Sequence, residues 1–251
     1  MPVKKSVKII LIMIIGCMTV SAALYSIGVP AVKKKTVSVV KKEALGWREE
    51  FAAVSEVDGN ILPAGWKLQK KPGTKPAVFS VETDAEKDLS FLHMGADKAS
   101  ACLINTVDGV DLKKTPFLRW RWRVTTLPQG ADGRMKAKDD QAIGIYVGTG
   151  SALSNKSVSY RWDTETPRGE EGNCAYGLGG TRVKWYTLRN REDAGSGQWF
   201  IEERNVAEDF KRAWGFYPEK IYLSVSCNSQ YTGSKAAADL EWIEFVSPST
   251  E

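Results

Sequence analysis

Histidine is nearly absent from this chain, since His93 is the single histidine among its 251 residues. A histidine-based catalytic triad would depend on that one residue, and a zinc site built from several histidines is excluded. His93 stands in an apolar run between Leu92 and Met94, which is typical of a core or edge position. We therefore expect no histidine chemistry.

Cysteine is also scarce, with four in the chain, of which Cys102, Cys174 and Cys227 follow the N-terminal segment. Three widely spaced cysteines give no disulfide framework and no Cys-x-x-Cys metal pattern. Two interpretations remain open: one pair closes in an oxidising compartment, or all three are buried free thiols. No metal and no cofactor is expected.

The formal net charge of +5 arises in the N-terminal segment. Residues 1–42 hold eight lysines and no acid, so the other 27 Lys and Arg face 30 Asp and Glu, and the rest of the chain has a charge of −3. Domains that bind nucleic acids carry a basic surface. A nucleic-acid partner is therefore not expected.

Residues 1–32 have the composition of a signal peptide or a membrane anchor. Three lysines precede an apolar stretch over residues 9–32, which is long enough to cross a bilayer as a helix. The same stretch fits a secretory signal with a small-residue exit near residues 20–22. We predict an apolar helix here, which holds the protein at the membrane if it is not cleaved.

Residues 33–45 form a predicted lysine-rich linker, and their five lysines complicate the topology. Counted against the three lysines before the apolar stretch, they would keep the domain in the cytoplasm under the positive-inside rule. The signal-like pattern favours export instead. We expect a periplasmic or otherwise extracytoplasmic protein, with membrane anchoring as the alternative to cleavage.

Residues 46–251 are predicted to form one antiparallel β-sandwich or jelly roll. Short runs rich in β-branched and aromatic residues are separated by turn signals such as Asp58-Gly59 and Asp108-Gly109. Long helices do not alternate with these runs, which argues against a parallel sheet. The expected strands are 65–69, 77–83, 89–94, 99–107, 116–127, 141–149, 157–163, 183–188, 198–204, 221–227 and 240–246.

One short helix is predicted over residues 205–214, with an apolar residue at every fourth position. Asn205 is a favourable N-cap, and Glu208 three residues later would complete a capping box. Gly215 suits the left-handed conformation that ends many helices. This helix is expected to close one end of the sandwich.

One predicted strand alternates strictly between apolar residues and arginines. Trp120 and Trp122 then lie on one face of the strand, and Arg119, Arg121 and Arg123 lie on the other, about 7 Å apart in succession. Because one face of the sheet must reach the core, we expect both tryptophans to be buried and the arginines to face outward.

Similar alternation gives other predicted strands a polar face. Crowded arginines repel one another unless acids pair with them, so one contiguous polar surface is expected. A planar lattice of arginines and carboxylates beside aromatic rings suits a sugar or a uronate, and a structural ion-pair lattice is the alternative. The candidate ligand-binding residues are Arg121, Arg161, Asp163, Glu202 and Arg204, with Asp139 and Asp140 at the edge.

Several segments together resemble a bacterial family, the domain-of-unknown-function family numbered 3047. They appear in the family's order, cover most of residues 60–246, and are Leu62–Trp66, Pro116–Val124, Asp139–Val147, Tyr160–Trp162, Trp199–Glu203, Arg204–Val206, Asp209-Phe210 and Trp214-Gly215. Members are typically secreted or periplasmic, so the resemblance implies export. Its strand pattern is similar to that of carbohydrate-binding jelly rolls, which is an analogy at the level of fold.

The chain departs from this family in one stretch. Members usually have an Asp-rich segment where this chain has Cys227-Asn228-Ser229-Gln230-Tyr231-Thr232. A metal or ligand role tied to those acids is therefore not carried over to this chain.

The sequence favours a non-catalytic extracytoplasmic β-sandwich that binds a glycan or a partner in the cell envelope. Nine tryptophans support this hypothesis, because tryptophan is enriched in sandwich cores and at surfaces that stack on ligands. The alternative is a carbohydrate-active hydrolase or lyase that uses acids and arginines of the polar face. No pair of carboxylates is selected by its spacing, and no catalytic residue is assigned.

Overall fold

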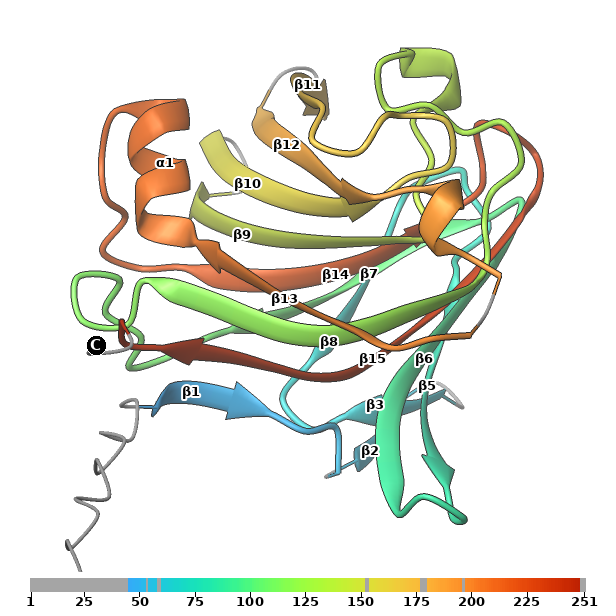
Figure 1. Ribbon diagram of the computed structural model, residues 1–251, viewed down its shortest axis with the longest axis horizontal. Helices are drawn as coiled ribbons and strands as arrows, with labels where there is room; N and C mark the ends of the chain where they lie inside the picture. Colours follow the sequence, from blue (N-terminus) through green and yellow to red (C-terminus); the bar gives the residue numbers. More distant parts are fainter. Residues whose placement is uncertain are drawn as a thin grey trace, which may run out of the picture. The chain divides into compact units, whose positions relative to one another are not determined.

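The computed structural model describes residues 45–248, apart from residues 53, 58, 59, 152, 153, 177–179 and 196. The predicted signal peptide or anchor, with its apolar helix, and most of the predicted linker lie outside the described residues. All described residues belong to one unit, residues 41–251. Within them, the chain is mostly β-structure with a single α-helix (Figure 1).

The first sheet has six strands in the order β13-β8-β15-β6-β5, and β1 also pairs with β15. Every pairing in this sheet is antiparallel. Its strands are β1 (Leu45–Glu49), β5 (Val78–Asp84), β6 (Leu89–Asp97), β8 (Phe117–Thr126), β13 (Phe200–Asn205) and β15 (Lys235–Val246).

The second sheet has seven strands in the order β11-β12-β10-β9-β14-β7-β4. Its strands are β4 (Lys67–Lys70), β7 (Ser100–Thr106), β9 (Ile143–Ser151), β10 (Ser154–Trp162), β11 (Glu171–Tyr176), β12 (Thr181–Arg189) and β14 (Tyr222–Asn228). A separate hairpin joins β2 (Val54–Val57) to β3 (Asn60–Pro63).

Eight of these strands follow the order of a jelly roll. The first sheet contains the sequence β6-β15-β8-β13 and the second contains β7-β14-β9-β10, so the chain crosses between the sheets in two interleaved Greek keys. The predicted all-β sandwich is therefore confirmed in its mainly antiparallel layers. It needs one correction, because β12 runs parallel to β10, its neighbour in the second sheet.

Aromatic side chains fill the space between the two sheets. Trp120 of β8 stacks on Tyr160 of β10 with ring centroids 5.3 Å apart, and Trp122 packs against Trp162 at 5.6 Å. All four side chains are fully buried. The predicted burial of Trp120 and Trp122 is thus confirmed, and the intervening arginines of β8 face outward with partial exposure.

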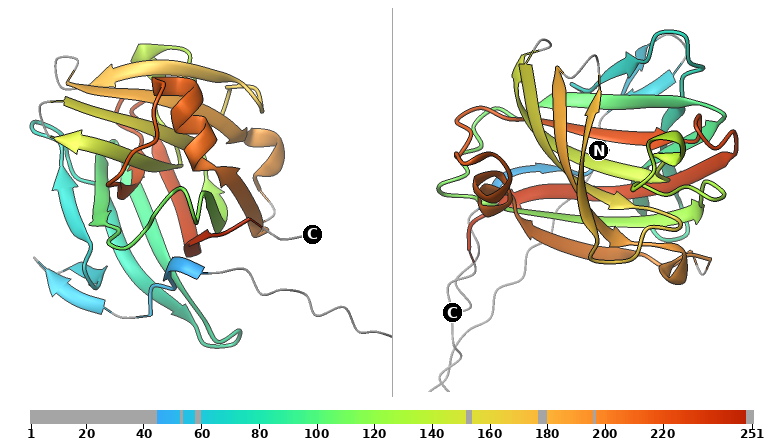
Figure 2. Two further views of the ribbon diagram at one scale, coloured as in Figure 1. Left: turned by 90° about the vertical axis from the view of Figure 1, so that its left-hand side faces the viewer. Right: turned by 90° about the horizontal axis from the view of Figure 1, so that it is seen from above.

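Helix α1 (Val206–Trp214) lies at one end of the strands, beside β10 and β13 (Figures 1 and 2). Asn205 caps it by accepting a hydrogen bond from the Glu208 backbone N–H at 3.1 Å, and Gly215 adopts the left-handed conformation with φ of 84°. The predicted helix and N-cap are confirmed. The Glu208 carboxylate instead accepts a hydrogen bond from Tyr217, at 3.0 Å.

Three regions of strand were not predicted from the sequence, namely β1, the β2–β3 hairpin and β11. Strand β11 contains Gly172, Asn173 and Ala175, which have low strand propensity, and the β2–β3 hairpin is very short. Among the described residues, no helix is both long and apolar enough to cross a bilayer.

Candidate functional site

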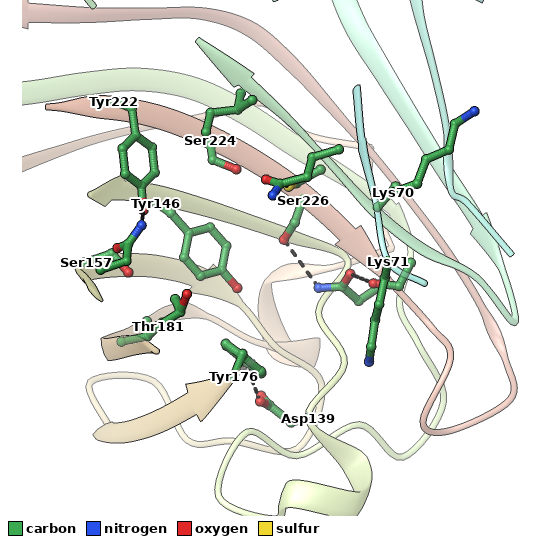
Figure 3. Close-up of a pocket in the computed structure, with 18 of the residues that line it drawn as sticks. Lys70, Lys71, Asp139, Tyr146, Ser157, Tyr176, Thr181, Tyr222, Ser224 and Ser226 are labelled. Carbon is green, nitrogen blue, oxygen red and sulfur yellow. Dashed lines mark hydrogen bonds between the residues drawn. The ribbon is translucent and has the colours of Figure 1, made fainter. Parts of the chain in front are cut away.

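The outer face of the seven-stranded sheet is hollowed by a cavity of about 760 Å³ (Figure 3). Its lining comes from strands across the sheet, from Gln69 on β4 to Tyr176 on β11. Strand alternation explains why polar groups gather here. On β14, Leu223 and Val225 are buried in the core, so Ser224 and Ser226 must point into the cavity.

Two tyrosines lie across glycines on β9. Tyr222 of β14 is the cross-strand partner of Gly148, and a Cβ added at Gly148 would lie 2.1 Å from the tyrosine ring. Tyr146, two residues along β9 itself, covers Gly144, and a Cβ added there would lie 2.8 Å from its ring. Glycine at these two positions therefore makes room for rings that rest against the sheet.

A chain of amide and hydroxyl groups crosses the floor of the cavity. Ser100 donates a hydrogen bond to the Asn228 side-chain oxygen at 2.6 Å, and Asn228 donates to Gln141 at 3.1 Å. Gln141 in turn donates to a carboxylate oxygen of Asp139 at 2.8 Å. This chain fixes the orientation of each amide. Ser100, Asn228 and Asp139 line the cavity, whereas Gln141 is fully buried and not part of the lining.

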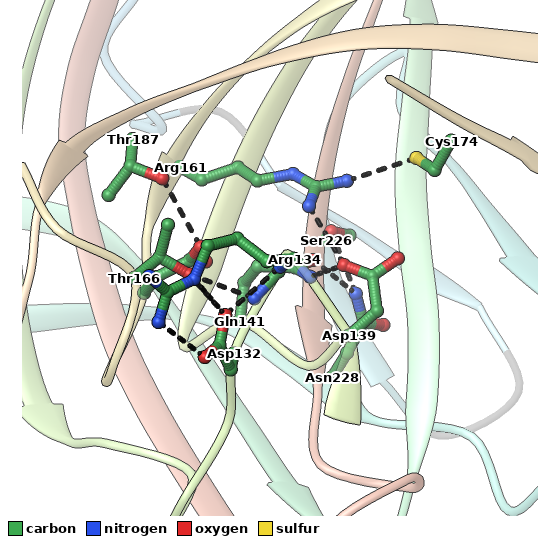
Figure 4. A network of polar contacts seen from close by, with 12 residues as sticks. Asp132, Arg134, Asp139, Gln141, Arg161, Thr166, Cys174, Thr187, Ser226 and Asn228 are labelled. Atoms are coloured by element: carbon green, nitrogen blue, oxygen red, sulfur yellow. Dashed lines mark hydrogen bonds and ion pairs between the residues drawn. The ribbon is translucent and has the colours of Figure 1, made fainter. Parts of the chain in front are cut away.

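Asp139 lies at the charged end of the cavity lining and pairs with Arg161, which is not part of that lining (Figure 4). Arg161 is fully buried and donates to Asp139 at 2.8 Å, while Tyr176 donates to the other carboxylate oxygen at 2.7 Å. The Arg161 guanidinium also lies over the Trp185 ring, 5.3 Å from its centroid. A buried ion pair with these additional partners holds Asp139 in one position.

Asp163 lies behind this end of the cavity and is enclosed by the loop that precedes β9. A Cβ added at Gly133 would lie 2.8 Å from its carboxylate, and Thr187 donates to the same oxygen at 3.3 Å. Burial raises the pKa of Asp163 to about 6, although the charge of Arg161 opposes that shift. In the same loop, hydrogen bonds from Arg134 lower the pKa of Asp132 to about 2.

Asp140 is a structural anchor. It is fully buried and accepts hydrogen bonds from the backbone N–H groups of Tyr231 and Thr232, at 3.2 and 2.7 Å. The Thr232 hydroxyl adds a third hydrogen bond at 2.9 Å. Asp140 therefore ties the β14–β15 loop to the loop before β9 and does not line the cavity.

The outer face of the six-stranded sheet carries Arg121, on the opposite side of the sandwich from Arg161. Arg121 pairs with Glu241 and lies 5.3 Å from the centroid of the Trp199 ring. Arg123 pairs with Asp239 at 2.6 Å and lies 4.6 Å from the same ring. These arginines form a lattice with acids of the neighbouring strand β15.

Glu202 and Arg204 lie on neither outer face. Each is opposite a core residue of β8, Trp120 and Leu118 respectively, so both side chains lie on the inner face of β13 at the edge of the sandwich. Glu202 accepts from Arg189 of the other sheet at 2.5 Å. Arg204 pairs with Asp209 at 2.8 Å, so both residues fasten the edge of the fold.

The structure therefore unites part of the predicted polar surface and separates the rest. Arg161, Asp139 and Asp163 lie together at one end of the second sheet, whereas Arg121 faces outward from the first sheet. The prediction of one contiguous surface is wrong for a physical reason. Alternation along a strand shows which side chains point away from the core, but it does not show which of the two sheets the strand belongs to. Glu202 and Arg204 do not follow the expectation that charged side chains point away from the core, because an edge strand tolerates charges on its inner face.

The candidate residues chosen from the sequence did not include the tyrosines and neutral polar groups of the cavity. The signal was present in the alternation of Ser224 and Ser226 with core residues, and in a β9 segment where Tyr146 lies between two glycines. The candidate residues were selected mainly because they are charged, so arginines and acids were favoured. Neutral hydroxyl and amide groups carry no repulsion that needs explanation, so their pattern is easily overlooked.

Several titratable groups of the described cavity lining are phenols and thiols. Burial raises the pKa of the Tyr146, Tyr176 and Tyr222 phenols and of the Cys102 and Cys174 thiols, which disfavours tyrosinate or thiolate bases. Among the described lining residues, Asp139 is the one carboxylate, whereas glycoside hydrolysis ordinarily needs two.

The three described cysteines are free thiols. Cys102 of β7 is opposite Ser226 and faces the cavity side of the sheet, whereas Cys227 lies in the core. These two thiols therefore lie on opposite faces and cannot form a disulfide without rearrangement of the sheet. Within the described part of the chain, no group of three or more His, Cys, Asp or Glu side chains could hold a metal ion.

Residues 64–244 match the family described as "Protein of unknown function (DUF3047)". The match spans more than half of the chain, so the protein belongs to this family. Asn228, Gln230 and Tyr231, which belong to the stretch where a departure from the family pattern is expected, line the cavity. None of the curated proteins compared with the chain matches it.

The solved structures that are similar to this one include the two that follow. The first is the enzymatically active domain of tailspike protein 4 of bacteriophage CBA120, with 11% identity, a TM-score of 0.37, and coverage of 73% of this chain and 19% of that chain. The second is the family 11 carbohydrate-binding module of the cellulosomal cellulase Lic26A-Cel5E of Clostridium thermocellum, with 10% identity and a TM-score of 0.42. The second match covers 84% of this chain and 97% of that chain.

Proposed function

We propose that this protein binds a glycan on the outer face of its seven-stranded sheet and does not cleave it. The observation that supports this function is the composition of the cavity. Four tyrosines, Tyr146, Tyr176, Tyr222 and Tyr231, share the lining with serine and threonine hydroxyls and with asparagine and glutamine amides. Aromatic faces stack on sugar rings, and fixed hydroxyl and amide groups match the alternating donors and acceptors of a sugar.

The size and order of the cavity fit the same function. About 760 Å³ is within the range of ligand-binding clefts in proteins. The Asn228 amide in the lining is oriented before any ligand arrives, because it accepts a hydrogen bond from Ser100 and donates one to Gln141. Such preorganisation reduces the entropy lost on binding.

A glycan array probed with the full chain tests this proposal, with Tyr222→Ala as the site variant. We expect the variant to lose about five- to thirtyfold in affinity, because a stacking ring in a binding site contributes on the order of 1–2 kcal/mol. Tyr217→Ala is the matched control. Tyr217 is an exposed tyrosine that follows helix α1, and its hydroxyl donates a hydrogen bond to Glu208 of that helix.

Three outcomes would count against glycan binding at this face. These are no retention of any glycan, equal losses for Tyr222→Ala and Tyr217→Ala, or no loss for either variant. Release of reducing ends or unsaturated uronates from a bound glycan would instead favour the hydrolase or lyase alternative. In that case Asp139→Asn should abolish the release.

We also propose that the domain acts outside the cytoplasm, in the periplasm or at the membrane surface. The support is the apolar stretch over residues 9–32 behind a basic start, together with the surface that a glycan or other envelope component would meet there. Alkaline phosphatase fused after Glu251 should be active in cells, because that enzyme needs an oxidising compartment. An inactive fusion would favour the positive-inside orientation, with the domain in the cytoplasm.

A further inference from the structure

The cavity lining has few charged side chains, and they differ in whether a group of opposite charge lies beside them. Asp139, the one carboxylate in the described lining, already receives hydrogen bonds from Arg161, Tyr176 and Gln141. Lys71 stands at the β4 end of the lining, and its ammonium contacts only an aromatic residue among its described partners. A ligand therefore meets a carboxylate that already has three hydrogen-bond donors, and a lysine ammonium with no carboxylate among its described partners.

Tyr231 holds the Lys71 ammonium at the rim. The Lys71 Nζ atom donates to the Tyr231 hydroxyl at 3.2 Å and lies 4.8 Å from the centroid of the ring. Tyr231 is 40% exposed, and its backbone N–H is fixed by Asp140. A cation over an aromatic face keeps its full charge, so it remains available to an anion that approaches from solvent.

The lining extends across the strands, so it suits a chain-like ligand. From Gln69 on β4 to Tyr176 on β11 there are six steps between neighbouring strands. At about 4.8 Å a step, this path measures roughly 29 Å along the sheet. Lys71 and Lys70 leave the β4 end in different directions, and Lys71 extends to the side on which Tyr176 and Asp139 lie (Figure 3).

We propose that the ligand is an acidic, chain-like glycan with uronate carboxylates, one of which pairs with Lys71 at the Tyr231 rim. This inference rests on the proposed function, since it names the class of glycan that the same cavity takes. The contribution of one exposed ion pair is modest and falls as salt rises. The expected selectivity is therefore a preference of about fivefold for the acidic chain over its neutral counterpart.

The test compares polygalacturonate with the same polymer after reduction of its carboxylates to alcohols. Binding of the full chain is measured by calorimetry or biolayer interferometry in low and in physiological salt. The wild-type protein should bind the acidic polymer about fivefold more tightly. Lys71→Gln should remove this preference, Lys71→Arg should keep it, and Lys113→Gln, at an exposed lysine outside the lining, should leave it unchanged.

The outcomes separate this inference from the proposed function. If both polymers bind equally and Tyr222→Ala abolishes both, glycan binding stands and the acidic preference is wrong. If dextran sulfate binds as well as polygalacturonate and neither is affected by Tyr222→Ala, the attraction is general ion exchange and both proposals fail. If Lys113→Gln weakens binding as much as Lys71→Gln, the rim cation is not the recognition group.

Discussion

The outer faces of the two sheets are both polar, yet one carries mainly paired charges and the other mainly neutral groups around a cavity. On the six-stranded sheet, Arg121 and Arg123 each pair with an acid of β15 and lie against Trp199. On the seven-stranded sheet, neutral side chains surround a cavity, and the charges are gathered at its end around Arg161 and at its β4 rim. A face whose charges pair within the protein offers little to a ligand, whereas hydroxyl and amide groups that line a hollow can be reached by one.

Burial also differs between the two faces. The Arg121 side chain is 33% exposed, whereas the Arg161 side chain is completely buried. An exposed ion pair contributes little to stability because water screens it, but breaking a buried pair leaves a charge without solvent. The same residue type therefore plays different parts on the two faces, and substitutions at matched positions measure the difference.

The largest expected effect is at Arg161. Arg161→Met should lower the free energy of unfolding by about 3–5 kcal/mol, because Asp139 is left with a buried charge and no cation. Arg121→Met, the matched change on the other face, should cost about 1 kcal/mol or less. Urea unfolding at pH 7 measures both. Equal losses would show that the two faces do not differ in this respect.

The next effect concerns pH and Asp163, whose pKa is raised by burial to about 6. Between its unfolded pKa of about 3.9 and pH 6, the folded state binds the proton more strongly, so the stability of the protein falls as pH rises through this window. Asp163→Asn should remove this dependence and raise stability at pH 7 by roughly 2–3 kcal/mol, with no gain near pH 3. Thermal unfolding followed from pH 3 to pH 8 checks the sign. A gain at pH 3 equal to that at pH 7 would contradict the titration.

A smaller effect is expected from glycines on the two faces. Gly148→Ala should cost about 1–3 kcal/mol and weaken glycan binding, because the new methyl group displaces the Tyr222 ring. Gly95 on β6 is the control, since its added Cβ would meet only the His93 ring, at an ordinary 3.8 Å. Gly95→Ala should be nearly neutral in both measurements. Loss of glycan binding by Gly95→Ala would mean that the arginine face takes part in recognition.

The smallest effect is at His93 on the arginine face. A hydrogen bond to Asp239 at 2.6 Å raises the pKa of His93 against the effect of burial. Stability from this contact is fully present below the unfolded pKa of about 6.5 and is lost as pH rises through the folded value. His93→Gln should therefore remove less than about 1 kcal/mol at pH 5.5 and less at pH 8.5. A larger loss at pH 8.5 would contradict the assignment of the charged form.

Local rules predicted the elements that depend on neighbouring residues. The alternation around Trp120 and Trp122 determined which side of β8 enters the core, because a strand has a period of two. Asn205 and Gly215 predicted the ends of α1, since both act on the backbone of their own turn. Strand boundaries were approximate, and β11 could not be predicted, because its pairing with β12 overrides the low strand propensity of its residues.

The candidate site depended on relations between distant strands. Asp139 was recognised as a candidate, but its partners Arg161 and Tyr176 reach it only through the order of β10, β12 and β11 in the second sheet. The acids that pair with the arginines of β8 also come from a distant segment, β15. No local pattern specifies which strand becomes a neighbour.

The sequence by itself determined the all-β character of the domain, the inward tryptophans, the capped helix and the polar outer faces, since each follows from local periodicity or capping. Only the tertiary structure decided that the arginines of β8 and Arg161 lie on opposite sides, because sheet membership is a choice among long-range pairings. The tertiary structure also decided that the cavity lies on the seven-stranded sheet, whose outer face carries mainly neutral side chains. A cavity arises from the curvature and order of several strands together, and each strand alone carries only the side chains that line it.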